Sequence, residues 1–181
     1  MANSAAAEVL EFWRTAGPSK WWRKNLEFDG EIKTRFGDMH KKAANRELDI
    51  WRKENQSCLA LVLILDQFSR NLLRGSDTSF AQDAYALEVA KYAVSNGFDR
   101  SENEDLAIFF YLPYMHSEKL DDQALCVELI RASGNESSLK AAIEHRDIIA
   151  RFGRFPHRNM VLGRTTSEEE QAFLDDGGFS G

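Results

Sequence analysis

The segment from His145 to Asn159, HRDIIARFGRFPHRN, gathers side chains that can bind an anion around a turn containing Gly153 and Pro156. Guanidinium and imidazole groups bind carboxylates and phosphates through charge-assisted hydrogen bonds. Alternatively, these arginines pair with the protein's own acids and with helix C-terminal carbonyls, and so hold the turn in place. The candidate ligand-binding residues of this segment are His145, Arg151, Arg154, His157, Arg158 and Asn159.

The charge distribution supports a local anion site and argues against nucleic acid as a partner. The chain has a net charge of -6, and binding to nucleic acid depends on cations that displace counterions from phosphates. The segment from His145 to Arg164 nevertheless holds five arginines and one acid, a net charge of +4, so the remainder carries -10. We therefore expect a small anion or an acidic peptide as the ligand, with a protein partner as an alternative.

A second polar cluster, DQFSRN, lies at the end of an apolar run. Asp66 and Arg70 are four residues apart with the acid first, which is the favourable order for an ion pair on a helix, and Asn71 follows. Such a pair at the end of a buried helix could line a cleft, or it could be an internal strut whose members only satisfy each other.

The third cluster, YLPYMHSE, surrounds Pro113, where a helix should kink or end because proline lacks an N–H donor. Tyr111, His116 and Glu118 are its candidate site residues, and His116 could act as a general base beside Glu118. The four histidines show no HxH or HExxH spacing, so no metal is expected. Glycine-rich nucleotide loops and the GxSxG motif are absent from the sequence, and no cofactor is expected.

Trp21 and Trp22 stand between basic residues. They could stack on a planar ligand or cover a partner's apolar surface, or they could cap the end of a helical core. If the tryptophans cover the surface of a partner protein, the chain is a protein-protein interaction scaffold.

The elements that must position these residues are all helical. Apolar residues recur every three or four positions, and capping residues, glycines and prolines separate the segments. We expect an all-α fold of seven or eight helices in one domain, residues 1–181, with a frayed tail over 175–181. Short links favour antiparallel helix pairs stacked in an α-α superhelix, with a compact irregular bundle as the alternative. The expected helices cover about 4–16, 27–45, 55–74, 80–95, 101–113, 121–134 and 138–152, and a short last helix follows Ser167.

Composition also bounds the location of the protein. Cys58 and Cys126 each lie in an apolar run and are expected to be core thiols in a reducing compartment. The N-terminus lacks a basic region followed by an apolar stretch, and no apolar run reaches the roughly 20 residues of a membrane span. We therefore expect a cytoplasmic protein.

Five motifs together resemble the bacterial family called domain of unknown function 924. They are VLEFWR, KWWRKNLEFDGEIKTRFGDMH, LALVLILDQFSRN, FFYLPYMHSE and HRDIIARFGRFPHRNMVLGR, and the resemblance extends from about Val9 to Leu174. The family is similar in fold to tetratricopeptide-like helical proteins, which implies a right-handed stack of helix pairs with a concave face. Where the family usually has proline, this chain has Ser69, which can continue a helix. The family implies no established reaction.

The resemblance marks positions without assigning them roles. Our leading hypothesis is a binding module in which Arg70, His116, Glu118, Arg154, His157 and Arg158 converge on one pocket for a small anion or an acidic peptide end. The rival hypothesis is a hydrolase-like or transferase-like enzyme that uses His116 or His157 as general base. The marked positions are Trp22, Asp66, Gln67, Arg70, Asn71, Tyr111, His116, Ser117, Glu118, His145, Arg151, Phe152, Arg154, Phe155, Pro156, His157, Arg158 and Asn159.

Overall fold

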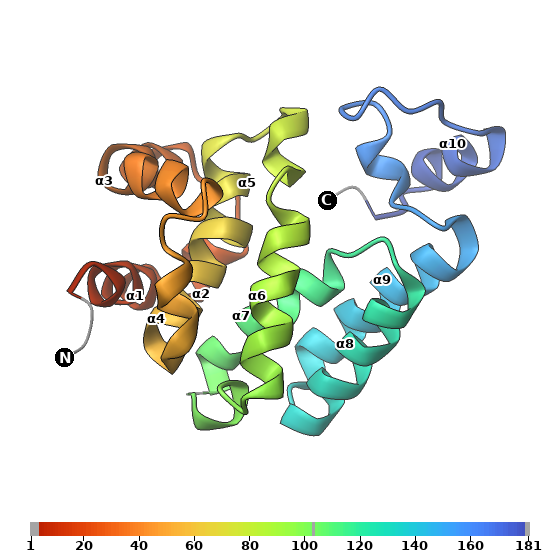
Figure 1. The fold of residues 1–181 in the computed structure, drawn as a ribbon. Helices are drawn as coiled ribbons and strands as arrows, with labels where there is room; N and C mark the ends of the chain where they lie inside the picture. The colour runs from red at the N-terminus through yellow and green to blue at the C-terminus, as the bar shows by residue number, and fades with distance from the viewer. Residues whose placement is uncertain (1–3, 103, 180–181) are drawn as a thin grey trace. The chain divides into compact units, whose positions relative to one another are not determined.

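The computed structural model describes residues 4–102 and 104–179, and in this part of the chain every regular element is helical. The prediction of an all-α fold with packed helix pairs is confirmed (Figure 1). Eight of the described α-helices are eight residues or longer, in line with the seven or eight expected. The helices are α1 Ser4–Ala16, α2 Pro18–Trp21, α3 Leu26–Ala44, α4 Asn55–Val62, α5 Ser69–Leu72, α6 Asp83–Ser95, α7 Glu104–Met115, α8 Leu120–Ser133, α9 Glu136–Phe152 and α10 Glu168–Asp175.

The chain was expected to form one domain, and its internal contacts group into two compact units. The N-terminal unit contains the residues up to Arg74 together with Thr78–Pro113, and the C-terminal unit contains Gly75–Asp77 and the residues from Tyr114 onward. Each unit is described by itself. Among the described residues, no helix has both the length and the apolar character needed to cross a membrane.

The core of the N-terminal unit is built around one continuous helical segment. It consists of α4, the π-helical turns η2 Leu63–Phe68, and α5. Every residue from Cys58 to Leu65 is fully buried, as expected for a helix that is apolar on all sides. Around it lie α1, α3 and α6, each contributing one apolar face.

A hydrogen-bonded serine lies where the π-helical turns return to α-helix. The hydroxyl of Ser69 donates to the main-chain oxygen of Leu65 at 2.6 Å, and the Nε2 atom of His40 lies 2.8 Å from the same hydroxyl. The helix then continues to Leu72, about two residues short of the end expected near Arg74. A serine keeps the N–H that a proline would lack, and its hydroxyl satisfies a carbonyl in the widened turn.

Helix α7 contains Pro113 and nevertheless runs on to Met115. Of the two outcomes expected at Pro113, an end of the helix is therefore wrong. Proline removes one main-chain hydrogen bond, but Leu112, Tyr114 and Met115 are all buried, and tertiary packing of this kind commonly outweighs a local helix breaker.

In the C-terminal unit, α8 and α9 lie side by side and are joined by a turn at Gly134 (Figure 1). Gly134 has φ +76°, the left-handed conformation that ends α8. Ile148 and Ile149 of α9 form a small buried cluster with Phe155. The partly buried rings of Phe152, Phe173 and Phe179 pack against it, and Phe179 comes from the segment 175–181. Ser180 and Gly181 lie outside the described residues.

The buried central helix gives a stability prediction with a matched control. Leu61 is 0% exposed, whereas Leu26 at the start of α3 is 73% exposed. We expect Leu61→Ala to lower the free energy of unfolding by about 2–5 kcal/mol, because it leaves a cavity among close-packed side chains. The same substitution at Leu26 should change it by less than about 0.5 kcal/mol. Urea denaturation of both variants is the measurement, and equal effects would contradict the assignment of α4 to the core.

Candidate functional site

The predicted site residues belong to both units. Asp66, Arg70, Asn71 and Tyr111 lie in the N-terminal unit, and the other eight lie in the C-terminal unit. The convergence of all three motifs on one pocket stays a prediction.

In the N-terminal unit, Arg70 is held by two carboxylates. Its two terminal nitrogens donate to the two oxygens of Asp83 at 3.0 and 3.1 Å, and one of them also lies 3.3 Å from Asp66 Oδ1. Asp66 is 1% exposed, and its main-chain oxygen accepts a further bond from Arg70 at 2.8 Å. Two acids around one guanidinium give the arrangement of an internal strut.

The other two predicted site residues of this unit, Asn71 and Tyr111, form hydrogen bonds with acids other than Asp66 and Asp83. Asn71 donates through Nδ2 to Asp29 of α3 at 2.7 Å, and Asp29 also accepts two hydrogen bonds from Arg74. The hydroxyl of the buried Tyr111 donates to Asp99 at 2.9 Å. These contacts tie α5 to α3 and α7 to the turn before it.

In the C-terminal unit, Glu118 anchors the loop that follows α9. Its two oxygens accept hydrogen bonds from the guanidinium of Arg164, both at 2.8 Å, and Oε1 also accepts the N–H of Phe155 at 2.9 Å. Burial alone would raise the pKa of this carboxyl, but the bonds from Arg164 and Phe155 hold the pKa below its ordinary value. Glu118 is therefore a charged anchor for the loop.

Glu170 is a second charged anchor, at the other end of the loop. Arg154 donates to both of its oxygens at 2.6 and 2.8 Å, and the main-chain N–H of Ser167 and the amide of Asn159 donate at 2.8 and 3.2 Å. The bonds from Arg154 contribute most to lowering the pKa of Glu170 to about 2. Ser167 and Glu170 also form a capping box at the start of α10.

Glu170 and Arg164 were not among the predicted site residues. The S-x-x-E spacing of Ser167 and Glu170 was a visible signal for the cap, but nothing local connects Glu170 to Arg154, 16 residues away. Arg151 likewise pairs with Glu169 at 2.9 Å. Three of the five arginines counted as a basic segment, Arg151, Arg154 and Arg164, are thus neutralised by acids from outside it.

Three of the chain's four histidines gather beside Arg158. We call His116, His145, His157 and Arg158 the histidine cluster; electrostatic interactions connect these residues to one another and to Glu118. Arg158 is only 7% exposed, and its guanidinium lies over the ring of Phe155 with Cζ 4.6 Å from the centroid. The ring of Phe155 lies 5.5 Å from that of His145 and 5.6 Å from that of His157.

Both flanking histidines are held in the neutral form. Burial is the largest cause that lowers the pKa of His145 and of His157 to about 4, and the positive charge of Arg158 lowers both further. His145 Nδ1 lies 2.8 Å from the main-chain oxygen of Ala141, so this nitrogen carries the proton and Nε2 has the lone pair. His157 Nδ1 is buried and has no hydrogen-bond partner among the described residues.

The last described residue forms a cover over this cluster. The ring of Phe179 lies 4.4 Å from that of His145 and 5.0 Å from that of His157. Gly177 has φ +80°, and its N–H and that of Gly178 donate to the oxygens of Leu174 and Phe173, which is the Schellman ending of a helix. A Cβ on Gly178 would lie 2.5 Å from the main-chain oxygen of Phe173, so only glycine fits this turn.

Among the described residues, no three His, Cys, Asp or Glu side chains are grouped so that they could hold a metal ion. The histidine cluster offers hydrogen-bond donors, lone pairs and one guanidinium. Such a set can bind an anion or a polar group, or accept a proton at low pH.

Comparison with other proteins places the chain in a family defined by sequence. Residues 9–178 match the family described as bacterial protein of unknown function (DUF924), and the chain belongs to this family. The chain is similar to a solved structure, described as a protein of unknown function, ATU0120, from Agrobacterium tumefaciens. The two share 45% sequence identity over 96% of this chain and 98% of that one, with a TM-score of 0.93. No curated protein matches the chain.

The lowered pKa of Glu170 predicts an acid-dependent loss of stability. A carboxylate whose pKa is lower in the folded state stabilises the fold above the unfolded pKa of about 4.3, and this contribution is lost as the pH falls toward 2. We expect Glu170→Gln to lower the melting temperature most above pH 5, with a difference from the parent protein that shrinks toward pH 2. Thermal denaturation across this range is the measurement.

Glu168→Gln is the matched control for this variant, because Glu168 lies on the same helix and is exposed. It should leave the pH profile of melting unchanged. If the melting temperatures of Glu170→Gln and the parent protein differ by the same amount at every pH, the charge of Glu170 does not stabilise the fold.

The cover formed by Phe179 predicts a change in histidine titration. We expect Phe179→Ala to admit water to His145 and His157 and to raise their pKa from about 4 toward the ordinary value near 6.5. Gly178→Ala should do the same while keeping the ring, because its Cβ collides with Phe173 and displaces the tail. Proton NMR of the imidazole C–H signals against pH measures both.

Two references accompany this titration. His40 lies in the other unit and should titrate identically in all variants, and Asp176→Ala changes an exposed tail residue that does not touch the rings. Unchanged titration of His145 and His157 in both Phe179→Ala and Gly178→Ala would mean that the tail does not control their solvation.

Proposed function

We propose that this protein is a binding module whose histidine cluster holds a small anion, such as a phosphate or a carboxylate at the end of an acidic peptide. The observation that carries the proposal is a buried, unsatisfied nitrogen beside a buried cation. His157 Nδ1 has no hydrogen-bond partner among the described residues, and Arg158 follows it directly. Buried polar atoms are normally satisfied, so an exception indicates a missing ligand or water.

Electrostatics favours an anion as that ligand. The positive charge of Arg158 and the neighbouring imidazoles lower the pKa of His157, after burial, which is the largest cause. The contribution of Arg158 favours a negative charge at this place, because a cation that repels a proton attracts an anion. Binding of an anion should therefore raise the pKa of His145 and His157, and by reciprocity a lower pH should tighten binding.

The proposed site is smaller than the set of residues marked by the sequence. Arg151, Arg154 and Arg164 already bind Glu169, Glu170 and Glu118, and recruiting them for a ligand would break ion pairs that hold the loop. Asn159 is fully buried with its amide on Glu170, and its role is to support the loop. We assign the ligand contacts to the histidine cluster because His157 Nδ1 is a buried nitrogen without a hydrogen-bond partner among the described residues.

The alternative functions receive less support. A general base works best when its pKa lies near the working pH, and a pKa of about 4 makes His157 a weak base at neutral pH. Trp22 is 53% exposed, but its ring stacks on Phe109 with centroids 5.6 Å apart, and Trp21 donates to the main-chain oxygen of Trp13 at 2.7 Å. The tryptophan pair thus has the contacts of a cap on the core of its unit.

The test uses the histidine signals as reporters. Titration with inorganic phosphate, and in parallel with acetate, should shift the imidazole C–H signals of His145 and His157 and raise their pKa, while His40 stays constant. Arg158→Lys keeps the charge but loses the planar donor pair, and we expect it to weaken phosphate binding by about tenfold.

Arg146→Lys is the matched control, because Arg146 pairs on the surface with Asp147 at 2.6 Å and should not affect binding. The proposal fails if neither anion shifts the two histidines, or if Arg158→Lys, folded as judged by its melting curve, binds phosphate as tightly as the parent protein.

A further inference from the structure

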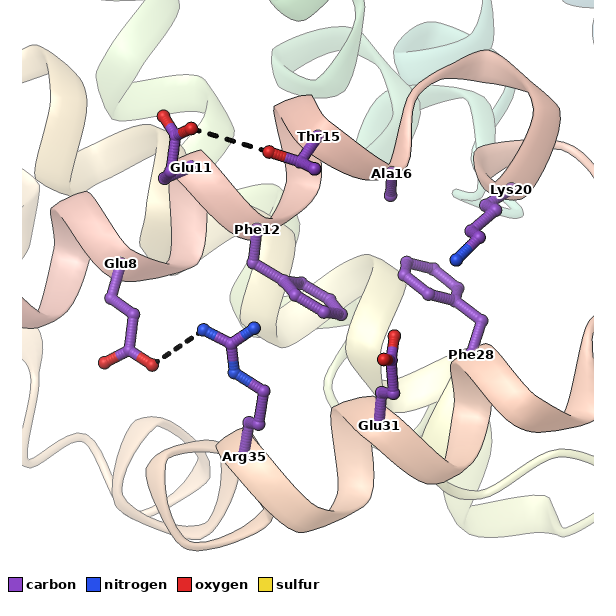
Figure 2. Close-up of a pocket in the computed structure, with 9 residues that line it drawn as sticks. All are labelled: Glu8, Glu11, Phe12, Thr15, Ala16, Lys20, Phe28, Glu31 and Arg35. Carbon is purple, nitrogen blue, oxygen red and sulfur yellow. Dashed lines mark hydrogen bonds and ion pairs between the residues drawn. The ribbon is translucent and has the colours of Figure 1, made fainter.

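A separate cavity of about 310 Å3 lies in the N-terminal unit between α1 and α3 (Figure 2). The lining residues of α1 and of α3 recur at intervals of three and four positions, so each helix contributes one face to the cavity. Lys20 from α2 closes one end. The lining consists of Glu8, Glu11, Phe12, Thr15, Ala16, Lys20, Phe28, Glu31 and Arg35.

Two stacked rings form the apolar part of this cavity. Phe12 and Phe28 have centroids 5.2 Å apart and planes inclined by 8°. Arg35 lies over the Phe12 ring at 4.8 Å and Lys20 over the Phe28 ring at 5.4 Å, at opposite ends of the pair in Figure 2. The ring faces are thus covered by the protein's own cations. Phe28 is 1% exposed and Phe12 9%, so Phe12 and Ala16 are left as the apolar surface for a short stem.

The charges of the cavity are incompletely paired. Glu8 binds Arg35 at 3.0 Å, but Glu11 has only a long hydrogen bond of 3.5 Å from Thr15 of the same helix. Glu31 has no hydrogen bond or ion pair with any described residue, and its carboxylate points between the two helices (Figure 2). Three exposed glutamates stand against one lysine and one arginine, so the lining carries a net charge of -1.

From this lining we infer that the cavity binds a small monocationic amine, with the ammonium group against Glu31 and Glu11 and a short apolar stem against Phe12 and Ala16. The volume is at the lower end of ligand pockets, which suits a small molecule or a single side chain. An ammonium group has the charge opposite to that of the lining and can form ion pairs with the two carboxylates. This site differs from the histidine cluster in its unit and in the sign of its ligand.

The experiment measures binding of defined probes to the full chain. n-Butylamine represents a free amine, and N-α-acetyl-lysine methylamide represents a lysine side chain of a peptide; n-butyrate has a similar stem with the opposite charge. We expect both amines to shift the main-chain amide NMR signals of α1 and α3, with weakening at high salt, and butyrate to leave them unchanged. A response to only one of the amines identifies the source of the ligand.

Variants with neutral isosteres test the two carboxylates. Glu31→Gln should weaken amine binding by about threefold, and Glu11→Gln with Glu31→Gln by about tenfold, as expected for partly exposed ion pairs. Glu27→Gln is the matched control, because Glu27 is exposed one turn earlier on α3 and does not line the cavity. Glutamine at these exposed positions preserves the fold, which the melting temperature verifies.

Three outcomes would overturn the inference. They are the absence of amine binding, binding of butyrate as tight as that of n-butylamine, and an equal effect of Glu27→Gln and Glu31→Gln. None of them bears on phosphate binding at the histidine cluster, so the two proposals fail independently.

Discussion

The charge compensation of Glu118 and Glu170 is the constraint on which the C-terminal unit depends. The loop between α9 and α10 has little regular structure, and a carboxylate out of water requires several donors to remain charged. The loop supplies these donors from Arg154, the Phe155 N–H and Arg164. Both carboxylates are therefore structural groups, and together they fix the two ends of the loop.

The position of the histidine cluster follows from these anchors. Glu118 binds the N–H of Phe155, and the ring of Phe155 contacts His145, His157 and the guanidinium of Arg158. The cluster thus rests on an aromatic ring whose main chain is tied to a charged carboxylate. The proposed anion site is therefore held by the fold in the absence of a ligand, and such pre-organisation reduces the ordering cost of binding.

The sequence predicted the helices well because their signals are local. These signals act within a few residues of the chain. Apolar periodicity and the fully apolar run Cys58–Leu65 predict helices that the structure contains, and the glycine after α8 marks the end of that helix. The ends were less predictable where two local rules compete, as at Pro113, because burial of the following residues decides the outcome. The contacts of Phe179 could not be predicted from the sequence. Gly177 and Gly178 indicate a turn, but they do not indicate that the ring after the turn contacts His145.

The site was harder to predict because the net charge of a sequence segment does not include the acids that the fold brings next to it. The arginine-rich segment looked like an unfilled anion site, yet Arg164 meets Glu118 from 46 residues away, and Arg154 meets Glu170 beyond the segment. On α1 and α3 the sequence gives no sign of a site, because glutamates there are typical of a solvated helix face. Only the fold shows that they line one cavity. In the arginine-rich segment, a buried atom whose hydrogen bond has no partner among the described residues is the informative feature. His157 Nδ1 is therefore a stronger indicator of a missing partner than the number of arginines around it.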